Sequence, residues 1–307
     1  MKPIEFRNAY YVKLGKGGEW EKYSIRENKI CIGWNRIDLT DINNGNWIKI
    51  RKELEYESKD KGKGIATRDY HALRWIAEST PDDIWVTFHS SRLWWCKVGK
   101  AEIFEDDISK YRKVAGKWHS QDIQNNLLII NQIPGTLSKL QGFRGTICRV
   151  KEVDDLRRLL NDQPSEAFKA ISGATESLVL EIEQGLKLLH WKDFETLVDL
   201  IFRGAGWRRV SVLGETMKYV DLELEEPITG DLYQVQVKSR ASRTEYKEYA
   251  KEFSSVGFKK LYFIVHSPIG DWNKEPTMQN AEFLLPKQVA KMVVEFGLTN
   301  WLMKKIK

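Results

Sequence analysis

The segment VDLELEEPITGDLYQVQVKSR, residues 220–240, decides the fold of the C-terminal half of the chain. Two runs typical of β-strands, Tyr219–Glu225 and Leu232–Lys238, flank a link that contains a proline and a glycine, so we predict a hairpin. Side chains alternate between the two faces of a strand. If the apolar residues face the core, three polar side chains meet on the opposite face of adjacent strands: Asp221, Gln236 and Lys238.

A carboxylate, an amide oxygen and an ammonium group in one place suit metal-assisted cleavage of phosphodiester bonds. Mg²⁺ prefers oxygen ligands, keeps several waters and accepts phosphate oxygens. A bound metal ion lowers the pKa of water and neutralises charge that develops on phosphorus. A lysine beside it can orient or deprotonate the attacking water. A plain cross-strand ion pair between Asp221 and Lys238 is the alternative reading of the same pattern.

The residues around the hairpin predict a mixed-sheet α/β domain over 177–307. A helix is expected at Trp191–Arg203, because its apolar residues recur at i, i+3, i+4, i+7 and i+8. The further expected elements are a strand at Arg208–Leu213, a helix at Thr244–Ser254, strands at Lys260–His266 and Ala281–Leu285, and a helix at Lys287–Phe296.

The run DFETLVDLIFRGAGW (193–207), followed by VDLEL and YQVQVKSR, resembles the Mrr branch of the PD-(D/E)XK nuclease superfamily. The resemblance implies a restriction-endonuclease-like fold and a Mg²⁺ cofactor. It implies Asp221 and Gln236 as metal ligands, with Lys238 as the catalytic lysine. Glu195, in the FE pair, would be an auxiliary acid near the metal. One departure is that the family often has Gly-x-Asp, whereas Tyr219 occupies the glycine position here.

The N-terminal half is rich in tryptophan, with eight of the 12 Trp before residue 120. Short strand-like runs with few helices suggest a small β-barrel. The expected strands are Tyr10–Leu14, Lys29–Trp34, Ile84–His89 and Trp94–Phe104, with one helix at Thr67–Ser79.

Residues 64–103 of this half are similar to the EVE and wider PUA-like family. The resemblance implies a pocket for a modified base taken out of its duplex. Such a base would stack on aromatic side chains and be read at its edge by polar groups. The candidates are Trp20, Trp34, Trp47, Thr67, Phe88, His89, Ser90, Trp94 and Trp95. Because Trp94 and Trp95 point to opposite faces of one strand, at most one of them would line the pocket. Simple core packing of these tryptophans is the alternative.

The composition and the breaks along the chain predict two domains. We expect a PUA/EVE-like recognition domain at 1–155, a linker at 156–176 and an Mrr-like nuclease domain at 177–307. A net charge of +6 is compatible with a polyanionic partner. Three widely spaced cysteines indicate neither a disulfide framework nor a zinc site, and no secretory signal or membrane span is expected. A cytoplasmic location fits this pattern.

The sequence therefore predicts a modification-dependent restriction-type endonuclease that acts on double-stranded DNA, as a homodimer at least during cleavage. Three alternatives stay open. One is a type II-like or repair nuclease that reads unmodified DNA. Another is a nucleic-acid-binding protein whose nuclease fold has lost catalysis. The third is a protein directed at RNA, since PUA-like domains are also associated with RNA.

Overall fold

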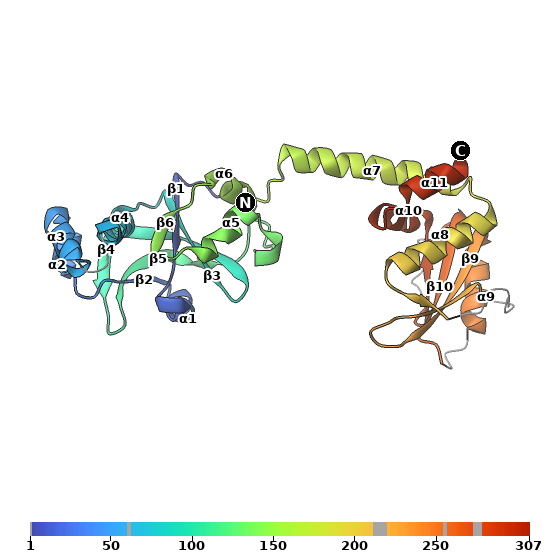
Figure 1. Cartoon of the computed structure of the whole chain (residues 1–307), viewed down its shortest axis with the longest axis horizontal. Helices are drawn as coiled ribbons and strands as arrows, with labels where there is room; N and C mark the ends of the chain where they lie inside the picture. The colour runs from blue at the N-terminus through green and yellow to red at the C-terminus, as the bar shows by residue number, and fades with distance from the viewer. Residues whose placement is uncertain (1, 60–62, 211–219, 254–256, 273–277) are drawn as a thin grey trace. The chain divides into compact units, whose positions relative to one another are not determined.

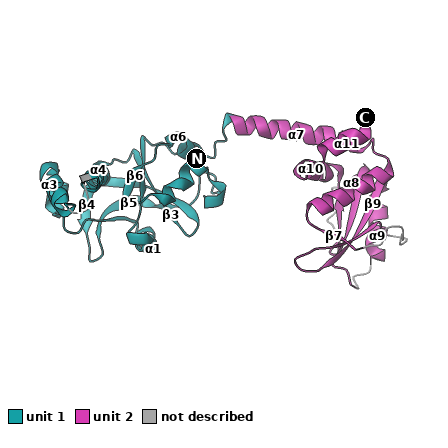
Figure 2. Cartoon of the chain, in the orientation of Figure 1, with its two compact units in different colours: residues 1–166 teal, residues 167–307 magenta. Residues whose placement is uncertain are grey.

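The computed structural model describes residues 2–59, 63–210, 220–253, 257–272 and 278–307. They form two compact α/β units, Met1–Glu166 and Ala167–Lys307 (Figure 1, Figure 2). Each unit contains one mixed β-sheet. In the described part of the chain, no helix has the length and apolar character needed to cross a bilayer.

The sheet of the first unit has six strands in the order β2-β5-β4-β3-β1-β6. Strand β1 runs parallel to β3, and the other pairs are antiparallel. The strands are β1 (Asn8–Val12), β2 (Lys29–Gly33), β3 (Asp83–His89), β4 (Arg92–Glu105), β5 (Lys110–His119) and β6 (Ile147–Arg149).

The prediction of a small β-barrel for this half is wrong. Strands β2 and β6 are the two edges of the sheet, and no ladder between described residues joins them. The sheet instead buries both of its faces against helices and loops. Tyr10 and Val12 belong to one core, and Ala9 and Tyr11 belong to another, as the alternation of strand side chains requires.

Helices cover these two faces. Ile42, Ile50 and Leu73 pack from α2, α3 and α4 into the first core, whereas Leu137 and Leu156 pack from α5 and α6 into the second. The helices are α1 (Glu21–Arg26), α2 (Leu39–Asn43), α3 (Trp47–Glu57), α4 (Lys63–Glu78), α5 (Gly135–Ser138) and α6 (Val153–Leu160), with 3₁₀ turns η1 (Lys16–Gly18), η2 (Ile130–Gln132) and η3 (Lys139–Gly142).

The sheet of the second unit has five strands in the order β11-β10-β9-β8-β7. The predicted hairpin is confirmed, because β8 and β9 pair antiparallel with Leu222 opposite Val235. Parts of three predicted elements lie outside the described residues: 211–213 of the strand predicted to begin at Arg208, 219 of the first hairpin strand, and 254 of the helix predicted to begin at Thr244. The strands are β7 (Arg208–Arg209), β8 (Leu222–Glu225), β9 (Leu232–Ser242), β10 (Lys260–Ile269) and β11 (Ala281–Leu284).

Helices α8 and α10 pack on one face of this sheet, and α9 packs on the other (Figure 1). The predicted amphipathic helix is confirmed as α8, whose Phe194, Leu197 and Ile201 are buried. The helices of this unit are α7 (Glu166–Leu186), α8 (Trp191–Gly204), α9 (Arg243–Glu252), α10 (Pro286–Glu295) and α11 (Thr299–Ile306).

The segment expected as a linker, 156–176, is mostly helical. Helix α6 runs to Leu160, and α7 begins at Glu166, so the break between them is short. Pro164 precedes the helix start, where a proline costs no hydrogen bond. Gly173 costs about 1 kcal/mol inside a helix, whereas the alanines of the same helix, Ala167, Ala170 and Ala174, are strong helix formers.

Candidate functional site

The site in the second unit begins where β8 and β9 separate. Asp221 directly precedes β8, and its backbone N–H donates to the carbonyl of Val235 at 3.0 Å. One oxygen of its carboxylate accepts from the backbone N–H of Val237 at 2.6 Å and from the side-chain amide of Gln236. The carboxylate thus takes the place of the next strand bond, and this fixes it against Gln236.

The amide of Gln236 is only half satisfied. The side chain is 3% exposed, and its nitrogen donates to Asp221. Its oxygen Oε1 is buried and has no hydrogen-bond partner among the described residues. A buried acceptor without a partner costs about 1–3 kcal/mol, so this oxygen is suited to a ligand.

Glu195 supplies a second acid, from the first turns of α8. His190 caps that helix at its N-terminus, where its ring nitrogen accepts from the backbone N–H of Lys192 at 3.4 Å. Burial raises the pKa of Glu195, and the negative charge of Asp221 raises it further. Nearby positive charges on Lys192, Arg209 and Lys238 offset part of this rise in pKa. The ionised forms of Glu195 and Asp221 therefore disfavour each other.

The pKa values of both carboxyl groups, Glu195 and Asp221, are raised. Burial raises the pKa of Asp221 above its ordinary value. The N–H of Val237, the charge of Lys238 and the amide of Gln236 lower that pKa only in part. Two acids whose ionised forms are both disfavoured indicate a place where further positive charge would be stabilising.

These residues fit a divalent cation. The unpaired oxygen of Gln236 and the carboxylates of Asp221 and Glu195 are hard oxygen donors of the kind that Mg²⁺ prefers. In the described part of the chain, no group of three or more His, Cys, Asp or Glu side chains is placed to hold a metal ion. The ligands proposed here are two carboxylates and one amide oxygen. So few protein ligands suit Mg²⁺, because that ion keeps several waters.

The candidates proposed for a base pocket do not converge on one place. Phe88 is buried in the second core of its unit, beside Tyr11. Trp95 packs on that side too, where its N–H donates to the carbonyl of Gln121. Trp94 lies on the other face of the sheet, as the alternation along β4 predicted.

The remaining candidates are also dispersed. Trp47 packs edge-on against Tyr70, with ring centroids 6.4 Å apart. His89 contacts the carboxylate of Glu21 at 3.0 Å, whereas Thr67 and Ser90 are exposed on α4 and on the turn between β3 and β4. Core packing accounts for most of the tryptophans in this half.

Two of the candidates line separate cavities. Trp47 lines one of about 420 Å³ on α3 and the turn before it. Trp34 lines another, of about 360 Å³, together with Trp20. Trp20 packs close to Gly15, where φ is +84° and a side chain would meet its ring within 3.0 Å. The cavity at Trp34 is lined by Lys13, Gly15, Lys16, Gly17, Glu19, Trp20, Ile32, Gly33, Trp34, Arg144, Gly145 and Thr146.

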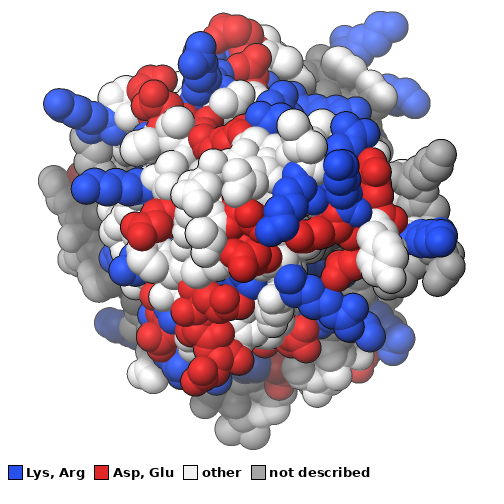
Figure 3. Space-filling model, turned by 90° about the vertical axis from the view of Figure 1, so that its left-hand side faces the viewer, with Lys and Arg blue, Asp and Glu red and all other residues white. Residues whose placement is uncertain are grey.

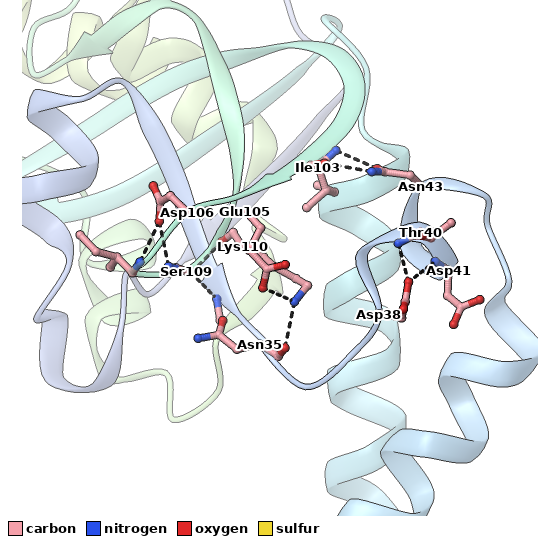
Figure 4. Close-up of polar contacts among 12 residues, drawn as sticks. Asn35, Asp38, Thr40, Asp41, Asn43, Ile103, Glu105, Asp106, Ser109 and Lys110 are labelled. Atoms are coloured by element: carbon pink, nitrogen blue, oxygen red, sulfur yellow. Dashed lines mark hydrogen bonds and ion pairs between the residues drawn. The ribbon is translucent and has the colours of Figure 1, made fainter.

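The loop that carries Trp34 is held by polar contacts on both sides. The backbone N–H of Gly33 donates to the hydroxyl of Ser109 at 2.9 Å. Lys110, which is 1% exposed, donates to the carbonyl of Asn35 at 3.0 Å and to Glu105 at 2.6 Å (Figure 4). The tryptophan is therefore presented on a restrained loop.

Positive charge is concentrated at this cavity. Three basic residues, Lys13, Lys16 and Arg144, line it with one acid, Glu19. In contrast, basic and acidic side chains are interspersed over the face shown in Figure 3. Sequence reasoning missed the three basic residues. The glycine-rich turn before Trp20 was the available signal. Arg144 is brought to it by the pairing of β6 with β1 and by the backbone bond from Lys13 to Thr146, at 2.7 Å, which are contacts between residues far apart in the sequence.

Comparisons with known proteins add nothing to this geometry. No protein-family model matches the chain, and no curated protein or solved structure matches it. Function is therefore inferred from the residues and contacts described above.

Proposed function

We propose that the chain is a Mg²⁺-dependent endodeoxyribonuclease of the modification-dependent restriction type. One observation carries the proposal. The amide nitrogen of Gln236 donates to Asp221, and its buried oxygen Oε1 has no hydrogen-bond partner among the described residues. The charge of Asp221 raises the pKa of Glu195, and the charge of Lys238 lowers the pKa of Asp221. The order of these residues along helix, strand and strand, and their resemblance to the Mrr branch, support the same conclusion.

Each of the four side chains would have its own role in the reaction. Asp221 and Gln236 would hold the ion, and Glu195 would assist from α8. When bound, Mg²⁺ would activate water and neutralise charge on the phosphate. Lys238 would orient the attacking water and stabilise the negative charge that forms on the phosphate oxygens.

Unit 1 would recognise the DNA through the cavity at Trp34. A base taken out of the duplex would stack on an indole face, which is worth about 1–3 kcal/mol. The three basic residues of the cavity would bind the phosphates on either side of that base. The volume of about 360 Å³ is of the size that small-molecule sites have.

Cleavage of both strands needs two sites. Each chain has one Lys238 and so cuts one strand at a time, which calls for a homodimer at least during cleavage. The proposed setting is the cytoplasm, where such an enzyme would meet incoming double-stranded DNA.

Cleavage of phage DNA that carries modified cytosines tests the proposal. Wild type, Lys238→Ala and the control Lys251→Ala, an exposed lysine of α9, are each incubated with Mg²⁺ or with EDTA. We expect cutting by the wild type and the control in Mg²⁺ only, and none by Lys238→Ala. Binding of this DNA without cutting under any condition would instead favour a recognition protein, a reading to which the glutamine at 236 also points.

A further inference from the structure

Helix α9 lies over the same face of the sheet as Gln236 and Lys238. These two residues pair in register with Phe263 and Val265 of β10, so all four side chains share one face. A capping box between Ser242 and Glu245 starts α9 directly after β9. The chain therefore folds back at once onto the strand that carries the proposed catalytic lysine.

This return places Tyr249 next to Lys238. The ammonium of Lys238 lies 5.0 Å from the centroid of the Tyr249 ring. The same ring packs against Phe263, with centroids 5.5 Å apart, so it is supported from the side of the sheet. An ammonium at this distance from an aromatic ring is attracted by its negative face.

Lysine needs such support more than the other residues of the site. Its charge sits on a flexible four-carbon stem, which samples many rotamers unless a neighbour restrains it. Asp221 and Gln236 are already fixed by their mutual hydrogen bond.

We propose that Tyr249 is a positioning residue for Lys238. Its ring keeps the ammonium over the face of the sheet where Asp221 and Gln236 lie. The catalytic consequence rests on the proposed function, whereas the contact itself does not.

Cleavage kinetics test the catalytic consequence. Tyr249→Phe keeps the ring, whereas Tyr249→Met keeps an apolar side chain against Phe263 without it. We expect kcat of Tyr249→Met to fall by about threefold to thirtyfold with KM unchanged. Tyr249→Phe should stay within about twofold of the wild type, because the ring itself makes the contact. Equal kcat in all three folded proteins, or an equal loss in both variants, would overturn the proposal.

Labelling of Lys238 tests the contact without any need for cleavage. Each protein receives a limiting amount of an amine-reactive reagent, and peptide mass spectrometry gives the labelled fraction of Lys238 relative to Lys251. We expect Tyr249→Met to label faster than the wild type, and Tyr249→Phe to match it. Unchanged labelling in both variants would refute the contact even in an inactive protein. Absence of cleavage by the wild type, with labelling as expected, would refute only the proposed function. Melting temperatures establish that each variant is folded, and Tyr249→Leu replaces Tyr249→Met if the latter is not.

Discussion

At the residue scale, Asp221 is a group whose ionised form costs stability. Burial raises its pKa, so the folded state holds the proton more tightly than the unfolded state. The free energy of unfolding therefore falls as the pH rises from the ordinary pKa through the raised one, and the loss is complete above it. At neutral pH, two changes would therefore stabilise the folded state: binding of a cation beside the Asp221 carboxylate, or replacement of that carboxylate by an uncharged group.

Asp221→Asn tests this electrostatic account. We expect the variant to melt at a higher temperature than the wild type at neutral pH, because the amide carries no charge. The difference should disappear in acid below the ordinary carboxyl pKa. Mg²⁺ should raise the melting temperature of the wild type but not of the variant. Glu225→Gln, at the far end of the strand that follows Asp221, is the control and should retain the response to Mg²⁺. A lower melting temperature for Asp221→Asn at neutral pH would contradict the account.

Trp34→Ala tests the cavity at Trp34 in the first unit. Loss of one stacking platform should weaken binding of modified DNA by about fivefold to 150-fold at fixed salt. Trp34→Phe should restore most of the affinity, and Trp47→Ala, which lies outside the cavity, should bind as the wild type does. Fluorescence anisotropy measures the affinities. Equal binding by Trp34→Ala and wild type would remove the cavity from the proposal.

At the scale of single elements, patterns of local origin were predictable. The β8–β9 hairpin and helix α8 follow from periodicity and a turn, and both depend on residues close in the sequence. The same alternation predicted that Asp221 would lie beside Gln236, and the structure joins them by a hydrogen bond. The pairing of strands that are distant in the sequence was not predictable.

Two features show this limit. Strand β6 pairs with the outer side of β1, which leaves the sheet open, and no local pattern reports that partner. The same pairing brings Arg144 and Thr146 to the turn that carries Trp20, so the cavity could not be assembled from sequence. A separate difference is local in origin: Gly173 and the small polar residues around it were expected in a linker, and they lie within α7.

Helix α7 allows a direct test of that correction. Gly173 lies within the helix, and a Cβ there would meet no atom within 4 Å. Gly173→Ala should therefore stabilise the protein by about 0.5–1 kcal/mol. Gly206, with φ at +88°, is the matched control, and Gly206→Ala should destabilise. Thermal unfolding followed by circular dichroism gives both values. A loss of stability in Gly173→Ala would argue against a helix at this position.

At the scale of the whole molecule, the two units have separate cores. The two clusters of the first unit contain only residues up to Leu160, and the two of the second begin at Val179. We expect fragments 1–166 and 167–307 each to unfold cooperatively, as judged by circular dichroism. Fragment 1–166 should retain the preference for modified DNA in binding assays. A fragment 1–166 that is folded but binds both DNAs equally would show that recognition does not reside there.

The most direct test of the central claim is cleavage by the wild type of two matched DNAs in Mg²⁺. One DNA carries modified cytosines, and the other has the same sequence without them. The account predicts that only the modified DNA is cut, and that EDTA and Lys238→Ala each abolish the cutting. Equal cutting of both DNAs would contradict recognition of a modified base, and cutting that persists in Lys238→Ala would contradict the proposed active site.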